Sequence, residues 1–300
     1  MTHSRTYVSF DWAMKKLLRQ KVNFDILEGF LSTLLEFDVK IYSILESESN
    51  PENEFDKNNK LDILCEDSEK RLIFIEVQYL RQTDFFHRIL FGASKLLTNY
   101  MEKGQPYEAF RKVYSINILY FDLGQGIDYV YHGRTEFYGI HQRDRLNLSR
   151  YQRNYFGYED VHQIYPEYFI LKINNFNQLA KSNLDEWIYF LKNSELPTTY
   201  SAAGLKEAGQ KLKYEKMSTK EQVKYDKYLE SFAVSESEIR TARYEGKEEG
   251  RQEGQELAEI RIILTAYQKG KSISTIAEFV DKPERKIKNI LIEHGLLQKS

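Results

Sequence analysis

The stretch that decides the fold runs from residue 61 to residue 80 and reads Leu61-Asp62-Ile63-Leu64-Cys65-Glu66-Asp67-Ser68-Glu69-Lys70-Arg71-Leu72-Ile73-Phe74-Ile75-Glu76-Val77-Gln78-Tyr79-Leu80. It holds two runs rich in strand-forming residues, 61–65 and 72–80, with a short polar break between them. Each run contains an acid of the kind that strands normally exclude, Asp62 in the first and Glu76 in the second. The pattern predicts a β-hairpin that holds two carboxylates for a divalent metal ion.

The register of this hairpin decides whether the two acids meet. If the strands pair antiparallel about a turn centred near Glu69, Asp62 stands opposite Glu76 and both side chains lie on one face of the sheet. Facing carboxylates repel, and the pKa of each is raised unless a positive charge lies between them. Oxygen ligands favour Mg2+ or Mn2+. The strand period also puts Gln78 on that face and leaves the carbonyl of Val77 near the metal.

A second interpretation of the same residues stays open. A slip of one residue in the pairing would send the two acids to opposite faces and remove the site. Apart from any slip, the second interpretation is that Asp62 caps a loop at the strand end, while Glu76 pairs with Arg81 or Arg88. The spacing of the acids is loose and does not decide between the two interpretations.

The composition bounds the class of protein. The chain has 300 residues, of which 41% are hydrophobic and 29% charged, so it can bury a substantial core. Its net charge of −2 provides no general basic field, so any contact with phosphates must come from a local basic patch or a bound metal. Cys65 is the single cysteine, which fits a reducing cytoplasm and excludes an intrachain disulfide. Without a long apolar run, the sequence predicts a cytoplasmic protein with no membrane-spanning part.

Predicted helices and strands alternate over the first 200 residues. Helical spacing of apolar residues predicts helices over 9–36, 83–103 and 183–191. Strand patterns occur at 39–45, 113–123, 129–140 and 168–173, and the polar residues 46–60 predict a loop. This order predicts an α/β or α+β core with a mixed sheet.

The composition changes towards the C-terminus, which predicts two domains, residues 1–205 and a charged helical extension, 206–300. Within the extension, Gly246, Gly250 and Gly254 recur at every fourth position. They indicate either a face that a partner helix approaches closely or a solvated charged helix. The last 30 residues predict a helix, a turn at Pro283 and a second helix, which resembles a helix-turn-helix.

A further segment, residues 150–158, alternates aromatic and basic side chains. Tyr151, Tyr155, Phe156 and Tyr158 interleave there with Arg150 and Arg153. Nucleic-acid surfaces use such alternation. We favour the alternative, in which the aromatic rings pack in the core or within a loop.

The order of helix, strand, strand with Asp, strand with Glu-x-Gln, helix and strand resembles the PD-(D/E)XK nuclease superfamily. It is more closely similar to the Rpn group of recombination-promoting nucleases and transposases, over about residues 5 to 200. The matching segments are Phe10-Asp11 with Lys15, Lys60 to Leu64, Phe74 to Gln78, the helix carrying Arg88 and Tyr100, and Ile116 to Phe121. The resemblance implies a restriction-endonuclease-like core, a central mixed sheet flanked by helices, followed by a helical C-terminal tail.

The resemblance also implies roles for individual residues. Asp62 and Glu76 would be the metal ligands, and Val77 would contribute its carbonyl. Asp11 would be a supplementary acid that positions the attacking water, and Lys15 would help to orient it.

Two positions depart from the superfamily pattern. Leu61 replaces the proline that names it, which matters little because that proline only shapes the strand end. Gln78 replaces the lysine of the third motif, and an amide cannot carry a positive charge. Lys15, Lys60 or Lys95 would have to supply that charge. Arg88 and Lys95 share a polar helix face that either holds a DNA phosphate or is simply solvated.

The expectation is therefore a Mg2+- or Mn2+-dependent DNA endonuclease of the recombination-promoting, transposase-like kind. Cutting both strands from opposite sides needs two sites, so a two-fold dimer is expected. One rival is a catalytically inactive relative that binds DNA or a protein through its tail. Another is a glycosidase that uses two carboxylates and no metal.

Overall fold

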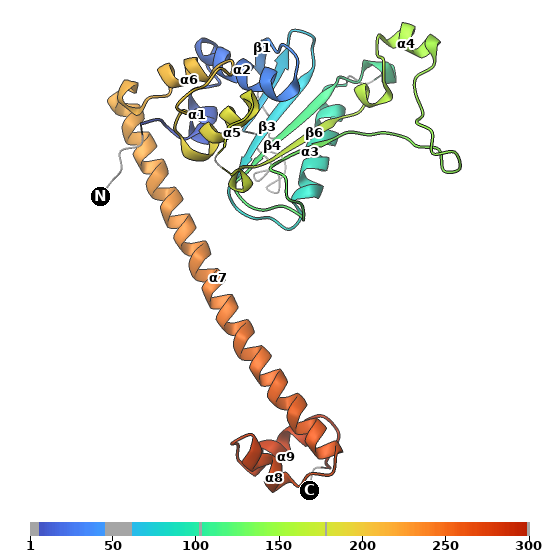
Figure 1. Ribbon diagram of the computed structural model, residues 1–300, viewed down its shortest axis with the longest axis vertical. Helices are drawn as coiled ribbons and strands as arrows, with labels where there is room; N and C mark the ends of the chain where they lie inside the picture. Colours follow the sequence, from blue (N-terminus) through green and yellow to red (C-terminus); the bar gives the residue numbers. More distant parts are fainter. Residues whose placement is uncertain (1–5, 46–61, 102–103, 178, 299–300) are drawn as a thin grey trace. The chain divides into compact units, whose positions relative to one another are not determined.

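Figure 1 presents a computed structural model of the chain, which describes residues 6–45, 62–101, 104–177 and 179–298. Contacts between residues divide the chain into two compact units, 1–222 and 223–300. The predicted domain boundary at residue 205 stays a prediction, because compactness alone does not define a domain. The predicted loop at 46–60 lies outside the described residues.

The first unit is built on a mixed six-stranded sheet, as the sequence predicts. β3 is parallel to β4 and β4 to β6, whereas the remaining neighbours are antiparallel. In spatial order the strands are β1 (Ile41–Leu45), β2 (Ile63–Asp67), β3 (Leu72–Gln78), β4 (Val113–Leu119), β6 (Glu167–Lys172) and β5 (Val130–Gly133).

The central strands are buried on both faces. Every residue of β4 is buried, and in β3 only Gln78 is partly exposed. Helices on both faces explain this pattern, because a parallel pair of strands is stable only when both of its faces are covered. The edge strands β1 and β5 are largely accessible.

One face of the sheet is covered by helices from both ends of the first unit (Figure 1). They are α1 (Phe10–Lys16), α2 (Phe24–Leu35), α5 (Asn183–Asn193) and α6 (Leu205–Lys211). Rings of Phe10, Phe30, Trp187 and Phe190 meet edge to face between them. The hydroxyl of Tyr120 donates to the carbonyl of Leu191 at 2.7 Å and ties the end of β4 to α5.

The opposite face is covered by α3 (Phe85–Asn99), which confirms the helix predicted over 83–103. Its buried stripe contacts the sheet in two apolar clusters. One cluster contains Leu64, Leu72, Phe74, Ala93, Leu96 and Val113, and the other contains Phe85, Ile89, Leu119 and Phe121. We call this side of the sheet the α3 face.

The single helix predicted over 9–36 is wrong. The chain leaves α1 after Lys16, passes through the short 3-10 turn η1 (Lys21–Asn23) and starts α2 at Phe24. The Asn23 amide donates to the Leu17 carbonyl at 2.9 Å, which satisfies an acceptor at the end of α1. The break lets both apolar stripes face the core, since Met14 of α1 and Ile26 of α2 are each fully buried.

The strand predicted over 129–140 is also wrong in length, because β5 ends at Gly133. Gly133 pairs with Tyr168, and β6 begins only one residue earlier, so a β5 that reached residue 140 would have no partner strand beyond its next residue. Residues 134–166, which we call the arm, leave the sheet instead. The arm contains α4 (Arg150–Phe156) and the 3-10 turn η4 (Val161–Gln163). Other 3-10 turns of this unit are η3 (Tyr107–Ala109), η5 (Ile173–Asn175) and η6 (Tyr214–Lys216).

The second unit contains most of α7 (Thr219–Gln268), then α8 (Ile273–Phe279) and α9 (Glu284–Glu293). Its core combines the end of α7 with both short helices through Ile263, Ile276, Ala277, Ile287, Ile290 and Leu291. The predicted pair of helices around Pro283 is therefore present, whereas its DNA role stays a prediction. None of the helices in the described ranges combines the length and the apolar character that crossing a bilayer requires.

Candidate active site

The hairpin of β2 and β3 has the predicted register. Ile63 pairs with Ile75, and Leu64 pairs with Phe74. Continued by one residue, this pairing sets Asp62 opposite Glu76. Because Leu64 and Phe74 belong to the apolar cluster under α3, the two acids also lie on the α3 face. The slip of one residue that would separate them does not occur.

Asp62 is bonded to the strand that carries the second acid. Its Oδ2 accepts the backbone N–H of Val77 at 2.7 Å. Its own carbonyl accepts a hydrogen bond from the guanidinium of Arg19. The side chain is therefore directed across the hairpin, towards the residue that follows Glu76.

The backbone N–H and C=O groups of Val77 point towards β2, as the pairing of β3 with β4 shows. Leu72 N–H donates to the Lys112 carbonyl, and Gln78 C=O accepts from Tyr120 N–H. In a parallel ladder these bonds involve alternate residues, so the even-numbered residues of β3 are bonded to β4. The N–H and C=O of Val77 consequently point towards β2, where Asp62 lies.

Glu76 is almost completely buried, with 4% of its surface exposed. Its Oε1 forms an ion pair with the guanidinium of Arg88, which enters from α3. A buried carboxylate requires such a partner because of the high cost of removing a charge from water. One element of the second interpretation, the pairing of Glu76 with Arg88, is therefore present together with the facing register.

The two cations predicted to hold a phosphate occupy different surroundings. Arg88 also donates to Gln82 Oε1 at 3.0 Å, so its guanidinium lies between that side chain and Glu76. Lys95 is partly buried and lies roughly 10 Å farther along α3. Arg88 alone of the two is placed beside the acids, and the DNA role of both stays a prediction.

Gln78 ends the hairpin strand β3, and Asp11 approaches the end of this strand from α1. The partly exposed Gln78 side chain donates to the Leu80 carbonyl at 3.3 Å. Asp11 is buried in α1 and accepts the hydroxyl of Tyr79 at 3.1 Å. The Tyr79 ring stacks on Tyr120, with 4.1 Å between ring centroids. Lys15 lies in α1, but its side chain, like the whole of Lys60, is outside the described part of the chain.

Asn117 lies beside Glu76 and is a candidate site residue that the sequence analysis did not select. It pairs in register with Glu76 on the neighbouring strand and is fully buried. Its Nδ2 donates to Ser115 Oγ at 2.9 Å and to the Phe169 carbonyl at 3.2 Å. Its Oδ1 has no hydrogen-bond partner among the residues that the structure describes. In the sequence, the feature that could have indicated Asn117 is a polar amide side chain in the middle of an otherwise apolar strand.

The orientation of the Asn117 amide follows from its partners. A backbone carbonyl can only accept, so the nitrogen must face Phe169 on β6. The oxygen is then turned away from β6. Together with Asp62 and Glu76, Asn117 forms what we call the polar band. This band crosses the α3 face between the apolar cluster around Phe74 and the one around Phe85.

The donor set of the polar band suits a hard divalent cation. Two carboxylates, an amide oxygen that lacks a described partner and the nearby Val77 carbonyl are all oxygen ligands, which Mg2+ and Mn2+ prefer. Within the described ranges, no group of three or more His, Cys, Asp or Glu residues is arranged to hold a metal. Water would therefore have to complete the coordination, as is usual for Mg2+.

A comparison with known proteins identifies the family of the chain. The family described as PD-(D/E)XK nuclease family transposase matches residues 8–242, which include the whole sheet and the helices on both of its faces. Neither the curated proteins nor the solved structures contain a significant match. Because the match covers well over half of the 300 residues, the chain belongs to the PD-(D/E)XK nuclease family of transposases.

Proposed function

We propose that the protein is a metal-dependent DNA endonuclease that hydrolyses phosphodiester bonds in a recombination-promoting or transposase-like reaction. Membership of a nuclease family supports the reaction class. The observation that carries the proposal is the hairpin register, which sets Asp62 and Glu76 on one sheet face. A facing pair of acids is costly unless a cation offsets their repulsion.

The metal would be Mg2+ or Mn2+, held by Asp62 and Glu76 with the backbone carbonyl of Val77. It would supply Lewis-acid stabilisation of the charge that develops on the phosphate. Arg88 neutralises Glu76 in the metal-free protein. Once a divalent cation balances that carboxylate, the guanidinium of Arg88 is available to bind a phosphate oxygen of DNA. Lys95 contacts DNA farther along the same helix.

The remaining residues orient the attacking water. Asn117 Oδ1 is fixed by the bonds of its own nitrogen, and it accepts a hydrogen from a water beside Glu76. The hydroxyl of Tyr79 holds Asp11 in one orientation, and Asp11 with Lys15 positions the water from the α1 side. Gln78 donates a hydrogen bond but no charge, so Arg88 carries the positive charge that a lysine provides elsewhere.

The assembly that fits this reaction is a two-fold dimer, since a double-strand cut needs one site for each strand. The C-terminal helices would serve assembly or DNA contact. A catalytically inactive DNA- or protein-binding relative is the second candidate. It is favoured by the amide at Gln78 and by the ion pair that occupies Glu76. Family membership gives no support to a glycosidase.

Nicking of supercoiled plasmid tests the proposal. We expect the wild type to nick DNA with Mg2+ or Mn2+ and to stop in EDTA, whereas Asp62→Asn and Glu76→Gln are inactive. Glu66→Gln is the matched control, because Glu66 is another acid of β2 on the same face and pairs with Arg111 at 2.8 Å. Equal nicking by all variants would reject the enzyme. An inactive wild type that still binds DNA would establish the second candidate.

A further inference from the structure

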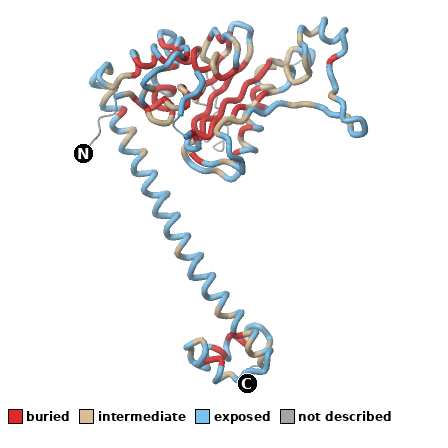
Figure 2. The backbone as a smooth tube through the Cα atoms, viewed as in Figure 1, coloured by how far each residue is buried: buried red, intermediate tan, exposed pale blue. Residues whose placement is uncertain are grey.

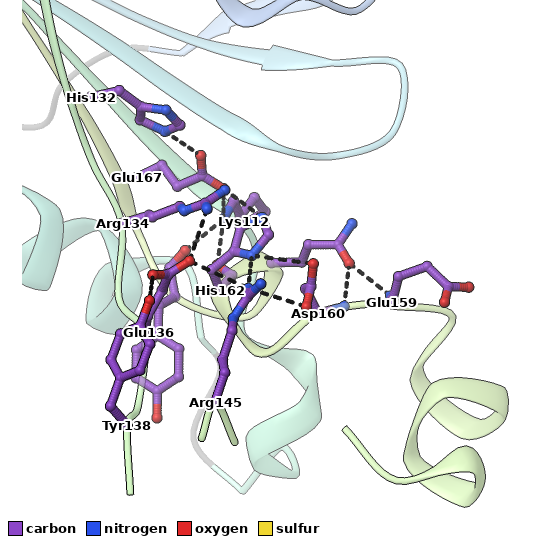
Figure 3. A network of polar contacts seen from close by, with 12 residues as sticks. Lys112, His132, Arg134, Glu136, Tyr138, Arg145, Glu159, Asp160, His162 and Glu167 are labelled. Atoms are coloured by element: carbon purple, nitrogen blue, oxygen red, sulfur yellow. Dashed lines mark hydrogen bonds and ion pairs between the residues drawn. The ribbon is translucent and has the colours of Figure 1, made fainter. Parts of the chain in front are cut away.

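The arm is anchored to the sheet by a buried ion pair, which Figure 3 shows. Lys112 Nζ, at the start of β4, donates to Glu167 Oε1 at 2.7 Å. The same nitrogen donates to the carbonyls of His162 at 2.9 Å and Tyr165 at 2.7 Å. Both members of the pair are buried. The Lys112 side chain therefore holds the returning end of the arm at two carbonyls, next to its ion pair with Glu167 of β6.

The two limbs of the arm are also bonded to each other. Arg145 lies between Glu136 at 3.4 Å and Asp160 at 3.1 Å, as Figure 3 shows. Tyr138 donates to Glu136 at 2.6 Å, and Glu136 also pairs with Arg134 at 2.8 Å. These bonds join the outgoing and returning limbs, so the arm presents α4 in a defined position.

Two aromatic residues of α4, Tyr151 and Tyr155, are exposed, so the expected packing in the core or a loop is wrong for them, whereas Phe156 is partly buried. Tyr151 is 75% exposed and Tyr155 58% exposed. Their rings stack with centroids 5.9 Å apart and planes 15° apart. A capping box between Ser149 and Gln152 starts this short helix, so the tyrosines stand on an ordered element. Figure 2 shows the outer part of the arm as largely exposed.

The charge of this part of the arm contrasts with that of the whole chain. Between residues 143 and 158 three arginines besides the paired Arg145 stand against one acid, Asp144, whereas the full sequence has a net charge of −2. Glu108 accepts the Tyr155 hydroxyl at 3.3 Å. Arg143, Arg150 and Arg153 are exposed, and none of them forms an ion pair with a residue that the structure describes. Their charge is available to an anionic partner.

Two flat rings beside uncompensated arginines match the surfaces that bind single-stranded nucleic acids, where bases stack on aromatic rings and cations hold phosphates. We propose that the surface formed by Arg150, Tyr151, Arg153 and Tyr155, which we call the α4 surface, binds unpaired nucleotides of the DNA substrate. The inference rests on the proposed function for the identity of the nucleic acid. It adds that the substrate carries a single-stranded segment.

The α4 surface is separate from the polar band. β3 and β5 are separated by three strand spacings, roughly 14 Å. The arm extends farther from the sheet at the β5 edge (Figure 1). A substrate that reaches both places needs a junction, with one part at the acids and an unpaired strand on the arm. Such a geometry selects branched, looped or end-frayed DNA over a continuous duplex.

Fluorescence anisotropy with a labelled single-stranded oligonucleotide tests the proposal in EDTA, so that neither metal nor cleavage contributes. We expect the double variant Tyr151→Ala/Tyr155→Ala of the full chain to bind at least about tenfold more weakly. For Arg150→Gln/Arg153→Gln, the slope of log K against log salt should fall in magnitude by about 1.4. Circular dichroism melting checks that each variant is folded.

Tyr42→Ala and Arg240→Gln are the matched controls, because Tyr42 is 74% exposed on β1 and Arg240 is exposed on α7. Both should bind as the wild type does. An α4 double variant that binds like these controls would overturn the proposal. So would equal affinity for a blunt, continuous duplex, or a loss of self-association instead of DNA binding.

One more variant separates this proposal from the proposed function. Asp62→Asn should lose nicking yet keep its affinity for the oligonucleotide. Binding that depends on the tyrosines in a chain that never nicks DNA would support the α4 surface and reject the nuclease. Nicking that is unaffected by the loss of both tyrosines on a forked substrate would reject the α4 surface and leave the nuclease intact.

Discussion

Asp62 Oδ2 accepts the N–H of Val77 at 2.7 Å, so the first acid of the hairpin is bonded to the residue next to the second acid, Glu76. The bond uses only the acceptor capacity of the carboxylate, not its charge. The choice of substitution at Asp62 can therefore separate the effect of losing this hydrogen bond from the effect of losing the negative charge.

We expect Asp62→Asn to unfold at nearly the wild-type urea concentration, because an amide oxygen also accepts the N–H of Val77. Asp62→Ala removes the acceptor and should lower the free energy of unfolding by about 1 kcal/mol. Both variants should lose Mn2+ binding in calorimetry. Retention of Mn2+ binding by Asp62→Asn would show that the aspartate is not a ligand.

The ion pair of Glu76 with Arg88 predicts a coupling between metal binding and stability. Arg88→Met removes the guanidinium beside a buried carboxylate and should lower the free energy of unfolding by up to about 3 kcal/mol without metal. Mn2+ should then raise the melting temperature of this variant more than that of the wild type. Arg111→Met, which removes the partner of Glu66, is the control and should show no larger Mn2+ effect than the wild type.

Asn117 predicts a gain of metal response. Asn117→Asp places a third carboxylate in the polar band, so the metal-free protein should melt at a lower temperature because the acids repel. Saturating Mn2+ should recover most of that loss, because each added charge favours a divalent cation. A variant that is destabilised equally with and without Mn2+ would place Asn117 outside the metal site.

The anchor of the arm predicts a loss of stability in acid. Burial disfavours the charge on Glu167, but Lys112 and His132 outweigh it and hold the pKa of this carboxyl below its ordinary value of 4.5. The folded protein therefore binds fewer protons here than the unfolded chain does. The contribution to stability is complete above pH 4.5 and is lost as the pH falls towards the lower folded pKa.

Urea unfolding between about pH 7 and pH 3 measures this contribution. Glu167→Gln should start less stable at neutral pH, because Lys112 keeps its charge without its partner, and should lose less on acidification. His162 Nε2 lies 4.0 Å from Glu167 Oε1, and His132 Nε2 lies 2.6 Å from Oε2. His132→Gln and His162→Gln therefore check whether a histidine, and not the glutamate, sets the transition.

The spaced glycines of α7 predict a gain in helix stability. Beyond the adjoining backbone of α7, an added Cβ at Gly246, Gly250 or Gly254 would meet no atom of the described residues within 4 Å. Alanine should stabilise the helix by about 1 kcal/mol at each position, measured as a higher melting temperature of the helical signal. Analytical ultracentrifugation then separates the two interpretations of this face. If the variant with alanine at all three positions self-associates more weakly, the glycines form a helix-packing face. If its self-association is unchanged, this part of α7 is a solvated helix.

Local sequence patterns were sufficient for several parts of the fold. A turn near Glu69 and the strand period of two determine the facing of Asp62 and Glu76, because both rules act over a few residues. The apolar stripe of α3 could also be predicted, because it depends on spacing over a few residues. The family was recognisable from the order of elements around the acids, and the family match confirms it.

The sequence pattern did not predict the split between α1 and α2 or the early end of β5. In both cases a distant partner decides the boundary: the buried core takes up Met14 and Ile26, and β6 starts too late to pair with a β5 that reached residue 140. A continuous pattern of apolar residues does not contain that information. Local periodicity therefore placed these elements correctly but gave them the wrong length.

What the sequence determined by itself is the pair of acids, their common face and the family, since these depend on residue type and short-range spacing. Only the tertiary structure decided which charges meet: Arg88 rather than Arg81 beside Glu76, Asn117 in register on the next strand, and the tyrosines of α4 exposed instead of packed. The physical reason is that the surroundings of a side chain are set by elements far away in the chain, whose approach no local pattern records.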